Sequence, residues 1–399
     1  RKSGDMLEAA LTAGLCSMGA KVIPLGVVPT PAVAYLTRYY KADAGVVISA
    51  SHNPCEYNGI KFFNSDGYKL SDGIENEIES YILGEKAIEE LPTHGKVGYV
   101  SANHNAVEDY VAFAVSTIDC RLDGMKIAVD CANGASYETA FKALNKLGAN
   151  VEAIHNTPDG VNINHMCGST HMESLQAYVT SIGADIGIAF DGDADRMLAV
   201  DENGKLIDGD QIMAACAKFM RDNGTLKQNT LVATVMSNLG LFMAGEKIGI
   251  NIPRTKVGDR YVLEEMLAKG YNIGGEQSGH IIFLDHNTTG DGLVSALQFL
   301  SVLKKTGMKA SEAASIVTVM PQVLRNAVVK LENKNSYMEN EEIAAACKAL
   351  EDEFAGEGRV LIRPSGTEPL VRVMIEGKDE EYITKKAEEL AELIEKILG

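Results

Sequence analysis

The sequence lacks the features that mark several large classes of protein. No apolar run approaches the roughly 18 residues that a membrane-spanning helix needs. The opening stretch, RKSGDMLEAA, does not contain the apolar core of a signal peptide. Seven cysteines are scattered along the chain without a CxxC pair, which argues against a zinc site and against a disulfide framework. We therefore expect a cytoplasmic protein whose cysteines are reduced.

Clusters of basic residues are also lacking. The formal net charge is −18, and no Lys/Arg block or aromatic-basic interleaving offsets it. Nucleic acid and acidic membrane surfaces are therefore not expected as partners, because long-range electrostatics would repel them. No GxxxxGK[ST] motif is present, so a nucleotide is not the expected phosphate donor. An anionic ligand would need a local group of positive side chains.

The chain does contain a regular alternation of short Val/Ile/Ala/Gly-rich runs with longer amphipathic segments, up to about residue 300. This pattern is typical of parallel sheets covered by helices, and it changes to a small α+β pattern beyond about residue 320. A chain of 399 residues is too long for one core. We expect three similar α/β domains with mixed, mainly parallel sheets and a smaller C-terminal α+β domain, with bounds 1–103, 104–207, 208–320 and 321–399.

The same pattern predicts individual elements. In the α/β part the predicted strands are 21–26, 126–130, 150–154 and 230–235, and the predicted helices are 5–19, 136–148 and 238–249. In the C-terminal part the predicted strands are 326–331, 358–363 and 369–377, with a helix near 339–354 and a Glu/Lys-rich helix at the end.

A weak repeat runs through the α/β part. The segment ADAGVVISASHN (42–53) aligns without gaps to ADIGIAFDGDAD (184–195), which places Ser51 on Asp193. A third unit, 264–280, repeats the order of helix, Gly turn, short strand and polar loop. Each polar loop would lie at the carboxyl end of a parallel strand, where open α/β sheets bind ligands. The alternative is that Gly-bounded strands look alike in any α/β protein.

The segment FDGDADR carries the strongest local signal. Asp191, Asp193 and Asp195 alternate, so in an extended loop their carboxylates converge on one hard cation such as Mg²⁺. The alternatives are an acidic surface turn and the start of an EF-hand loop. Taken alone, Ser51 is typical of a turn residue or a helix cap, but near Mg²⁺ its hydroxyl suits phosphoryl transfer. Lys61 suits proton transfer if its pKa is lowered, and a solvent-facing lysine is the alternative.

Two further loops suit a phosphosugar. GGEQSGH (274–280) offers a carboxylate and a hydroxyl to sugar hydroxyls, and its glycines allow a close approach. RPSGTEPLVR (363–372) combines two arginines with Ser and Thr hydroxyls, which suits a phosphate clamp. A surface turn with chance arginines is the alternative reading of the second loop.

Taken in order, SASHNP, DGDADR, GEQSGH and RPSGTEP resemble the four active-site loops of the α-D-phosphohexomutase superfamily, and the resemblance covers the whole chain. It implies an isomerase of four domains whose loops meet at a central cleft, with Mg²⁺ as cofactor and a sugar 1,6-bisphosphate as intermediate and activator. Members of this superfamily normally begin a few tens of residues earlier, so the first domain is expected to be incomplete.

The resemblance also implies a role for each matching residue. It makes Ser51 the phosphoserine, Lys61 the general acid/base, and Arg196 and His52 neighbours of the phosphoryl group. The implied Mg²⁺ ligands are Ser51, Asp191, Asp193 and Asp195. The implied substrate-binding residues are Gly258, Asp259 and Arg260 of the segment KVGDR, then Glu276, Ser278, His280, Arg363, Ser365, Gly366, Thr367 and Arg372.

Within the superfamily, GEQSGH and the run at 25–54 are most similar to the branch that interconverts glucosamine 6-phosphate and glucosamine 1-phosphate on the route to UDP-N-acetylglucosamine. Branches that act on mannose or glucose phosphates are the alternative. A phosphatase and a non-catalytic sugar-phosphate sensor are the rivals, and retention of Ser51, Lys61 and the three aspartates argues against the sensor. The expected partner is a small phosphosugar, and a homodimer is the candidate assembly.

Overall fold

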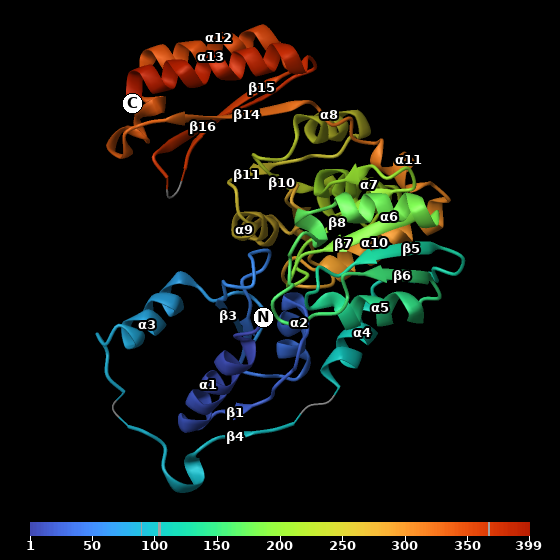
Figure 1. Cartoon of the computed structure of the whole chain (residues 1–399), viewed down its shortest axis with the longest axis vertical. Helices are drawn as coiled ribbons and strands as arrows, with labels where there is room; N and C mark the ends of the chain where they lie inside the picture. Colours follow the sequence, from blue (N-terminus) through green and yellow to red (C-terminus); the bar gives the residue numbers. More distant parts are fainter. Residues whose placement is uncertain (89, 103–104, 366–367) are drawn as a thin grey trace. The chain divides into compact units, whose positions relative to one another are not determined.

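The structure is a computed structural model, and it describes residues 1–88, 90–102, 105–365 and 368–399. These residues form two compact units (Figure 1). The first unit comprises Arg1–Met236 and Gly249–Ile316, and the second comprises Ser237–Ile248 and Val317–Gly399. Three successive regions of α/β structure make up the first unit.

The first region pairs its strands two by two. Strand β2 (Ala44–Ile48) lies antiparallel to β3 (Ile60–Asn64), and β1 (Lys21–Val22) lies parallel to β4 (Tyr99–Val100). Helix α2 packs against β2, and it begins with a proline in its first turn, where a missing N–H costs no helical hydrogen bond. The other helical elements are α1 (Gly4–Ser17), α2 (Thr30–Tyr39), α3 (Asp72–Ile82) and the 3-10 turn η1 (His94–Lys96).

The second region contains a five-stranded sheet in the order β6-β5-β7-β8-β9. Strands β6, β5 and β7 are parallel, whereas β8 and β9 are antiparallel to their neighbours. Every residue of β7 is buried, as expected for a strand covered on both faces. Gly187 of β7 allows helix α6 to approach, since a Cβ there would lie 2.6 Å from Cγ2 of Val179. The elements are α4 (Ala106–Ser116), β5 (Lys126–Asp130), α5 (Ser136–Lys146), β6 (Asn150–Ile154), η2 (Gly168–Thr170), α6 (Glu173–Ile182), β7 (Ile186–Phe190), β8 (Met197–Asp201) and β9 (Leu206–Ile207).

The third region contains a four-stranded sheet in the order β11-β10-β12-β13, in which only β13 is antiparallel. Helix α10 is buried along most of its length and packs against α4 and α7. Asp291 caps α10 by accepting the Val294 N–H, and it also accepts the Tyr110 hydroxyl of α4 at 2.7 Å. The elements are α7 (Gly209–Asp222), η3 (Lys227–Asn229), β10 (Val232–Thr234), β11 (Arg254–Thr255), α9 (Asp259–Lys269), β12 (Ile273–Gly275), β13 (Ile281–Phe283), α10 (Gly292–Thr306) and α11 (Ala310–Ala314).

Each region of the first unit contains one strand that turns back into an antiparallel partner, namely β2 into β3, β7 into β8, and β12 into β13. The gapless alignment of 42–53 with 184–195 places the bounds of β2 on those of β7. The polar loops are the connections of these hairpins. A parallel strand precedes the loop in β7 and β12, but within the described residues β2 pairs only with β3.

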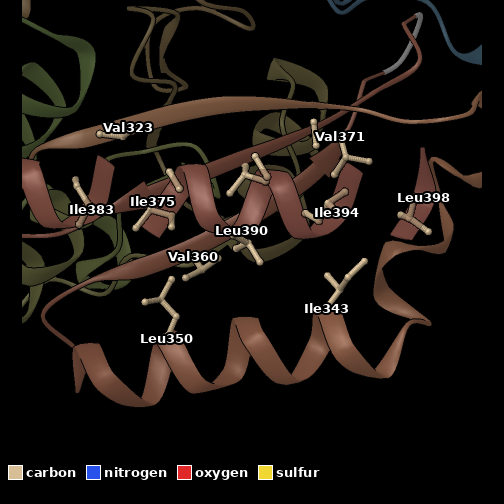
Figure 2. Packing of buried hydrophobic residues seen from close by; sticks show 14 of the residues in the cluster. Val323, Ile343, Leu350, Val360, Val371, Ile375, Ile383, Leu390, Ile394 and Leu398 are labelled. Atoms are coloured by element: carbon tan, nitrogen blue, oxygen red, sulfur yellow. The ribbon is translucent and has the colours of Figure 1, made fainter. Parts of the chain in front are cut away.

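The second unit is built on a three-stranded antiparallel sheet in the order β14-β16-β15. Helices α12 and α13 bury an apolar core on this sheet, and Figure 2 shows Ile343 and Leu350 of α12 pointing into it. The elements are α8 (Leu239–Ile248), β14 (Gln322–Val328), the 3-10 turns η4 (Leu331–Asn333) and η5 (Ser336–Met338), α12 (Glu341–Phe354), β15 (Arg359–Pro364), β16 (Leu370–Glu376) and α13 (Glu380–Leu398).

Helix α8 is attached to the second unit by a buried ion pair. Glu376 of β16 is fully buried, pairs with the Arg359 guanidinium at 2.8 Å and accepts the Leu239 N–H at the start of α8. Removal of one partner from such a pair is costly, because a buried charge is left alone. These contacts explain why α8, which lies inside the predicted third domain, packs with the C-terminal sheet.

The predicted fold class is confirmed by the three α/β regions and the C-terminal α+β unit. The strands at 126–130 and 150–154 have the predicted bounds. Strand β1 ends at Val22, earlier than predicted, and Pro24 lacks the N–H that a longer ladder would need. Within the described ranges, no helix combines the length and the hydropathy that a membrane crossing requires.

Candidate active site

Ser51 lies in the connection between β2 and β3 with its backbone in the left-handed region, at φ 50°. Its hydroxyl donates to Asp191 Oδ2 at 2.8 Å, and its N–H donates to Ser49 Oγ at 2.9 Å. A left-handed backbone costs a non-glycine residue about 1–2 kcal/mol, so the surrounding contacts must hold it. The structure therefore brings the serine loop and the aspartate loop together.

Asp191, Asp193 and Asp195 lie in the tight connection between β7 and β8. Their side chains are buried, and one oxygen from each lies within 4.8 Å of the others. The Oδ1 atoms of Asp193 and Asp195 are buried and have no hydrogen-bond partner among the described residues. Strands flank the loop, whereas helices flank an EF-hand loop, so the EF-hand alternative is wrong. Three convergent carboxylates, with two buried oxygens that accept no hydrogen bond, fit a hard divalent cation.

The charges of this group shift its pKa values in opposite directions. Burial, followed by the charges of Asp195 and Asp193, raises the pKa of Asp191 well above its ordinary value. Burial also acts to raise the pKa of Asp195, but the nearby cations of His280, Lys61 and Arg196 outweigh it and the pKa is lowered. Burial and mutual repulsion therefore oppose ionisation of this group, whereas the neighbouring cations favour it.

Lys61 of β3 pairs with Asp193 Oδ2 at 2.8 Å and lies 4.0 Å from Asp195 Oδ2. Burial acts to lower the pKa of Lys61, but the two carboxylates outweigh burial and the pKa is raised. The lowered pKa on which the proton-transfer hypothesis depended is therefore wrong. Lys61 is positioned against the acidic group as an ammonium ion.

Arg196 and His52 lie side by side next to the serine. Nη1 of Arg196 is 3.2 Å from Nδ1 of His52, and Nε of Arg196 is 3.9 Å from Asp195 Oδ1. Burial and then the Arg196 charge lower the pKa of His52, which favours a neutral imidazole that accepts from the guanidinium. Arg196 and His52 therefore offer hydrogen-bond donors beside Ser51, where an anion could accept them.

His280 lies between two carboxylates at the start of β13. Its Nδ1 is 3.6 Å from Asp195 Oδ2, and its Nε2 is 3.6 Å from Asp259 Oδ2. Burial acts to lower the pKa of His280, but Asp195 and Asp259 outweigh it and the pKa is raised. His280 thus connects the aspartate loop to the start of α9, where Asp259 also pairs with Lys69.

The other residues predicted to bind the sugar lie less close to the three aspartates than His280 does. Glu276 accepts the Gly258 N–H at 3.0 Å, so the loops at 256–260 and 276–280 are in contact. Ser278 is exposed and Arg260 is also exposed, with its guanidinium on Glu264 of its own helix and on Asp72. No described contact ties Ser278 or Arg260 to the three aspartates.

The C-terminal arginines face each other across the sheet of the second unit. Arg363 of β15 and Arg372 of β16 are directly opposed in the antiparallel ladder. Burial, followed by the charge of Arg372, lowers the pKa of Arg363. Like charges placed opposite each other are destabilising, and a bound anion would relieve the repulsion. The Arg372 guanidinium meets one acid, Glu368, at 3.3 Å.

Ser365 continues this group with a buried side chain whose hydroxyl is shared with Glu368. The Lys334 ammonium donates to the Ser365 carbonyl at 3.0 Å, which adds a cation that sequence reasoning missed. Gly366 and Thr367, also predicted phosphate ligands, lie outside the described residues.

Sequence reasoning also missed three residues that support the serine and the aspartates. Thr30, at the start of α2, donates its hydroxyl to Asp193 Oδ2 at 2.7 Å and its N–H to the Asp193 carbonyl. Arg1 and Asn164 both donate to the Ser51 carbonyl, each at 2.9 Å. Thr30 lies within the run at 25–54 that carried the resemblance, whereas no local signal singled out Arg1 or Asn164.

A second group of metal-ligating residue types, Asp130, His155 and Cys167, lies near the ends of β5 and β6. Asp130 is fully buried, and its oxygens accept the Ala132 and Gly168 N–H groups and pair with His155 Nδ1 at 2.9 Å. Because these partners satisfy the carboxylate, the group acts as an anchor for the backbone around it.

Four models of one family match the chain in order. They are the phosphoglucomutase/phosphomannomutase α/β/α domain I at 1–89, domain II at 107–204, domain III at 208–320 and the C-terminal domain at 327–393. The fold is similar to that of a phosphoglucomutase/phosphomannomutase family protein from Burkholderia thailandensis (TM-score 0.81, 22% identity, 99% of this chain and 87% of that one). It is also similar to N-acetylphosphoglucosamine mutase from Aspergillus fumigatus, solved with GlcNAc-6P and magnesium (TM-score 0.67, 19% identity, 93% of each chain).

Relatives with much higher sequence identity than these solved structures show which branch of the superfamily the chain belongs to. Phosphoglucosamine mutase of Ruminiclostridium cellulolyticum is 63% identical over 395 residues, which is 99% of this chain and 88% of the relative. The enzyme of the same name from Acetivibrio thermocellus is 62% identical over 399 residues, which is 100% of this chain and 89% of the relative. The fold and the order of the loops define an isomerase of the α-D-phosphohexomutase superfamily. Within it, the chain belongs to the phosphoglucosamine mutase family.

Proposed function

We propose that this chain interconverts glucosamine 6-phosphate and glucosamine 1-phosphate, with Ser51 as the residue that gives and takes the phosphoryl group. The observation that carries the proposal is the Ser51 hydroxyl donating to Asp191, inside a group of three buried carboxylates with two unpaired oxygens. Relatives at 62–63% identity that are named for this reaction support the choice of an amino sugar.

Mg²⁺ fits the acidic group, because Asp191, Asp193 and Asp195 offer hard oxygen ligands that lie within 4.8 Å of one another. A fungal mutase of the same fold has been solved with magnesium. When bound, the ion would neutralise charge on the phosphoryl oxygens next to Ser51. Thr30 and Lys61 hold the Asp193 side chain in place with or without the ion, since both donate hydrogen bonds to its Oδ2.

The first half of the cycle starts from phosphorylated Ser51. A hydroxyl oxygen of the sugar phosphate attacks the phosphorus, and the bond from phosphorus to Ser51 Oγ breaks. The Lys61 ammonium gives a proton to Ser51 Oγ and takes the proton of the sugar hydroxyl, so its charge is restored. The product is a bound sugar 1,6-bisphosphate. Arg196 and His52 supply donors to the transferring group.

In the second half the bisphosphate turns round and Ser51 attacks its other phosphorus, with the same proton exchange in reverse. Glu276 and His280 are the proposed contacts to sugar hydroxyls, with Ser278, Gly258, Asp259 and Arg260 completing the sugar loops. The phosphate that is not reacting is proposed to bind Arg363, Ser365, Gly366, Thr367 and Arg372. Repulsion between the opposed arginines supports an anion at that position.

A coupled assay with glucosamine 1-phosphate, glucose 1-phosphate and mannose 1-phosphate tests the proposal, together with the intact mass of the protein after exposure to a sugar 1,6-bisphosphate. We expect the amino sugar to be preferred and one phosphate to be added. Ser51→Ala should lose the isomerisation and the added phosphate. Ser80→Ala should keep both, because the Ser80 hydroxyl bonds to the Glu77 carbonyl of its own helix.

Three outcomes would contradict the proposal. Preference for glucose or mannose phosphate would move the chain to the other branch. Release of inorganic phosphate without isomerisation would indicate a phosphatase, and binding without turnover would indicate a sensor.

A further inference from the structure

The loop that carries Ser51 is held by its carbonyl oxygens from two sides. The Ser51 carbonyl accepts from Arg1 Nη2 and from Asn164 Nδ2, each at 2.9 Å. The Asn53 carbonyl accepts from the same two nitrogens, at 2.9 Å and 3.0 Å. Arg1 Nη1 donates to the Pro54 carbonyl as well. Two side chains from distant parts of the sequence therefore fix one short turn.

The numbers of donors and acceptors match in this arrangement. An amide nitrogen and a guanidinium Nη each carry two hydrogens, and a carbonyl oxygen has two lone pairs. Asn164 Nδ2 and Arg1 Nη2 each use both hydrogens, and the Ser51 and Asn53 carbonyls each receive two. The orientation of the Asn164 amide follows, since a reversed amide would set its oxygen against two carbonyl oxygens.

We propose that Arg1 and Asn164 form a clamp that positions Ser51 for phosphoryl transfer, an inference that rests on the proposed function. Ser51 has a left-handed backbone that it would not adopt unaided. Its carbonyl direction sets ψ, so a fixed carbonyl fixes the direction of the Cα–Cβ bond and places Oγ at 2.8 Å from Asp191. The two clamp side chains act through the backbone and are positioning residues.

Asn164 is itself anchored to the loop that follows β5. Its N–H donates to the Ala132 carbonyl at 2.9 Å. The loop that carries Asn164 is held near both ends by Asp130, which pairs with His155 at 2.9 Å and accepts the Gly168 N–H at 2.9 Å. The hydrogen bonds of buried Asp130 therefore support the clamp, because they keep the loop that carries Asn164 close to Ser51.

The clamp also fits closely against the aspartate loop. A Cβ at Gly192 would lie 2.7 Å from both Asn164 Nδ2 and the Ser51 carbonyl oxygen. Only glycine leaves room for this approach between Asp191 and Asp193. The clamp, the serine and the aspartate loop thus form one packed group, and a displacement of the turn would change the distance from Oγ to the acidic group.

The test uses Asn164→Ala, Asn164→Asp and Arg1→Ala, with Asn162→Ala as the matched control. The Asn162 side chain bonds only within its own loop, to the Thr157 carbonyl and the Asp159 N–H. Dephosphorylated protein is mixed with glucose 1,6-bisphosphate, and phosphorylation of Ser51 is followed by intact mass in a single turnover. Steady-state kcat and KM for glucosamine 1-phosphate are measured in parallel.

We expect the clamp variants to lower kcat and the phosphorylation rate by about 10- to 100-fold, with KM within about twofold. Because partial unfolding would also lower the apparent kcat at constant KM, each rate is divided by the folded fraction of the variant measured by circular dichroism. Asn164→Asp should be slower than Asn164→Ala, because its carboxylate faces two carbonyl oxygens. Arg1→Lys should recover part of the rate, and Asn162→Ala should match the parent.

The inference is overturned if Arg1→Ala and Asn164→Ala keep the parental rate, or if Asn162→Ala is impaired as much as they are. If Asn164→Ala does not fold, Arg1→Ala decides, since Arg1 is partly exposed. A parent protein that takes no phosphate on Ser51 would overturn the proposed function. A parent that is phosphorylated normally, with clamp variants of equal rate, would overturn the clamp alone.

Discussion

Replacement of Asp193 by Asn separates the two kinds of electrostatic interaction at the acidic group. The pair of Lys61 Nζ with Asp193 Oδ2 at 2.8 Å is worth about 6 kcal/mol at an effective dielectric constant of about 20. When all three carboxylates are ionised, repulsion of Asp193 by each of the other two, at up to 4.8 Å, costs about 3.5 kcal/mol or more at the same dielectric constant. Asp193→Asn removes both effects, and they nearly cancel.

The consequence is a variant whose stability without Mg²⁺ is close to that of the parent but whose response to Mg²⁺ is weaker. A ligand present at 100 times its Kd stabilises the folded state by about 2.7 kcal/mol, and a tenfold weaker ligand at the same concentration by about 1.4 kcal/mol. At about 2.1 cal/mol/K of unfolding entropy per residue, the Tm of a chain of 399 residues changes by about 1.2 °C per kcal/mol, so the Mg²⁺-induced rise in Tm should be about 1.5 °C smaller.

Differential scanning calorimetry over a Mg²⁺ titration measures this difference without reference to activity. Asp123→Asn is the matched control, since it removes the same charge from an exposed side chain paired with Arg121. An equal Mg²⁺-induced rise in Tm for Asp193→Asn and the parent would refute the reasoning. So would a fall of several kcal/mol in the Mg²⁺-free stability of Asp193→Asn, since it would show that the repulsion is small.

Three further outcomes are expected. Arg363→Ala should lower kcat/KM by about 30-fold or more, because it removes a proposed phosphate ligand, and should leave the Tm unchanged or higher, because it removes the repulsion from Arg372. A lower Tm with unchanged kinetics would contradict this. Gly192→Ala should destabilise the protein by about 1–3 kcal/mol and slow Ser51 phosphorylation, whereas Gly14→Ala, which has open space around it, should do neither. The hydrogen bond to Asp130 raises the pKa of His155, although burial acts to lower it. The stability that the charged His155–Asp130 pair contributes is therefore complete below about pH 6.5 and is lost as the pH rises through the raised pKa. His155→Gln should therefore lose stability at pH 6 and little at pH 9 in chemical denaturation, and an equal loss at both would exclude the linkage.

The raised pKa of Lys61 changes how its role is understood. Sequence reasoning required a lysine with a lowered pKa, but Asp193 and Asp195 lie against the ammonium group and outweigh its burial. A lysine that stays charged suits an exchange in which it gives one proton and takes another in the same step. Its partner Asp193, a proposed Mg²⁺ ligand, is then also the group that keeps Lys61 protonated.

The sequence by itself determined the elements and the loops. The strands at 126–130 and 150–154 follow from short β-branched runs, and helix α5 follows from apolar spacing at 136–148, because these signals are local. The three hairpin loops were visible for the same reason, since polar residues end each strand. The order of the loops along the chain was enough to indicate a phosphohexomutase.

Only the tertiary structure decided which side chains support those loops and how their charges balance. Asn164 meets Ser51 across 113 residues and Thr30 meets Asp193 across 163 residues, and no periodicity within either segment encodes such a contact. Helix α8 was predicted correctly as a helix, but its attachment to the C-terminal sheet depends on the buried Glu376. Local patterns fix backbone conformation, whereas pKa values, clamps and attachments depend on which charges and donors folding brings within a few ångströms.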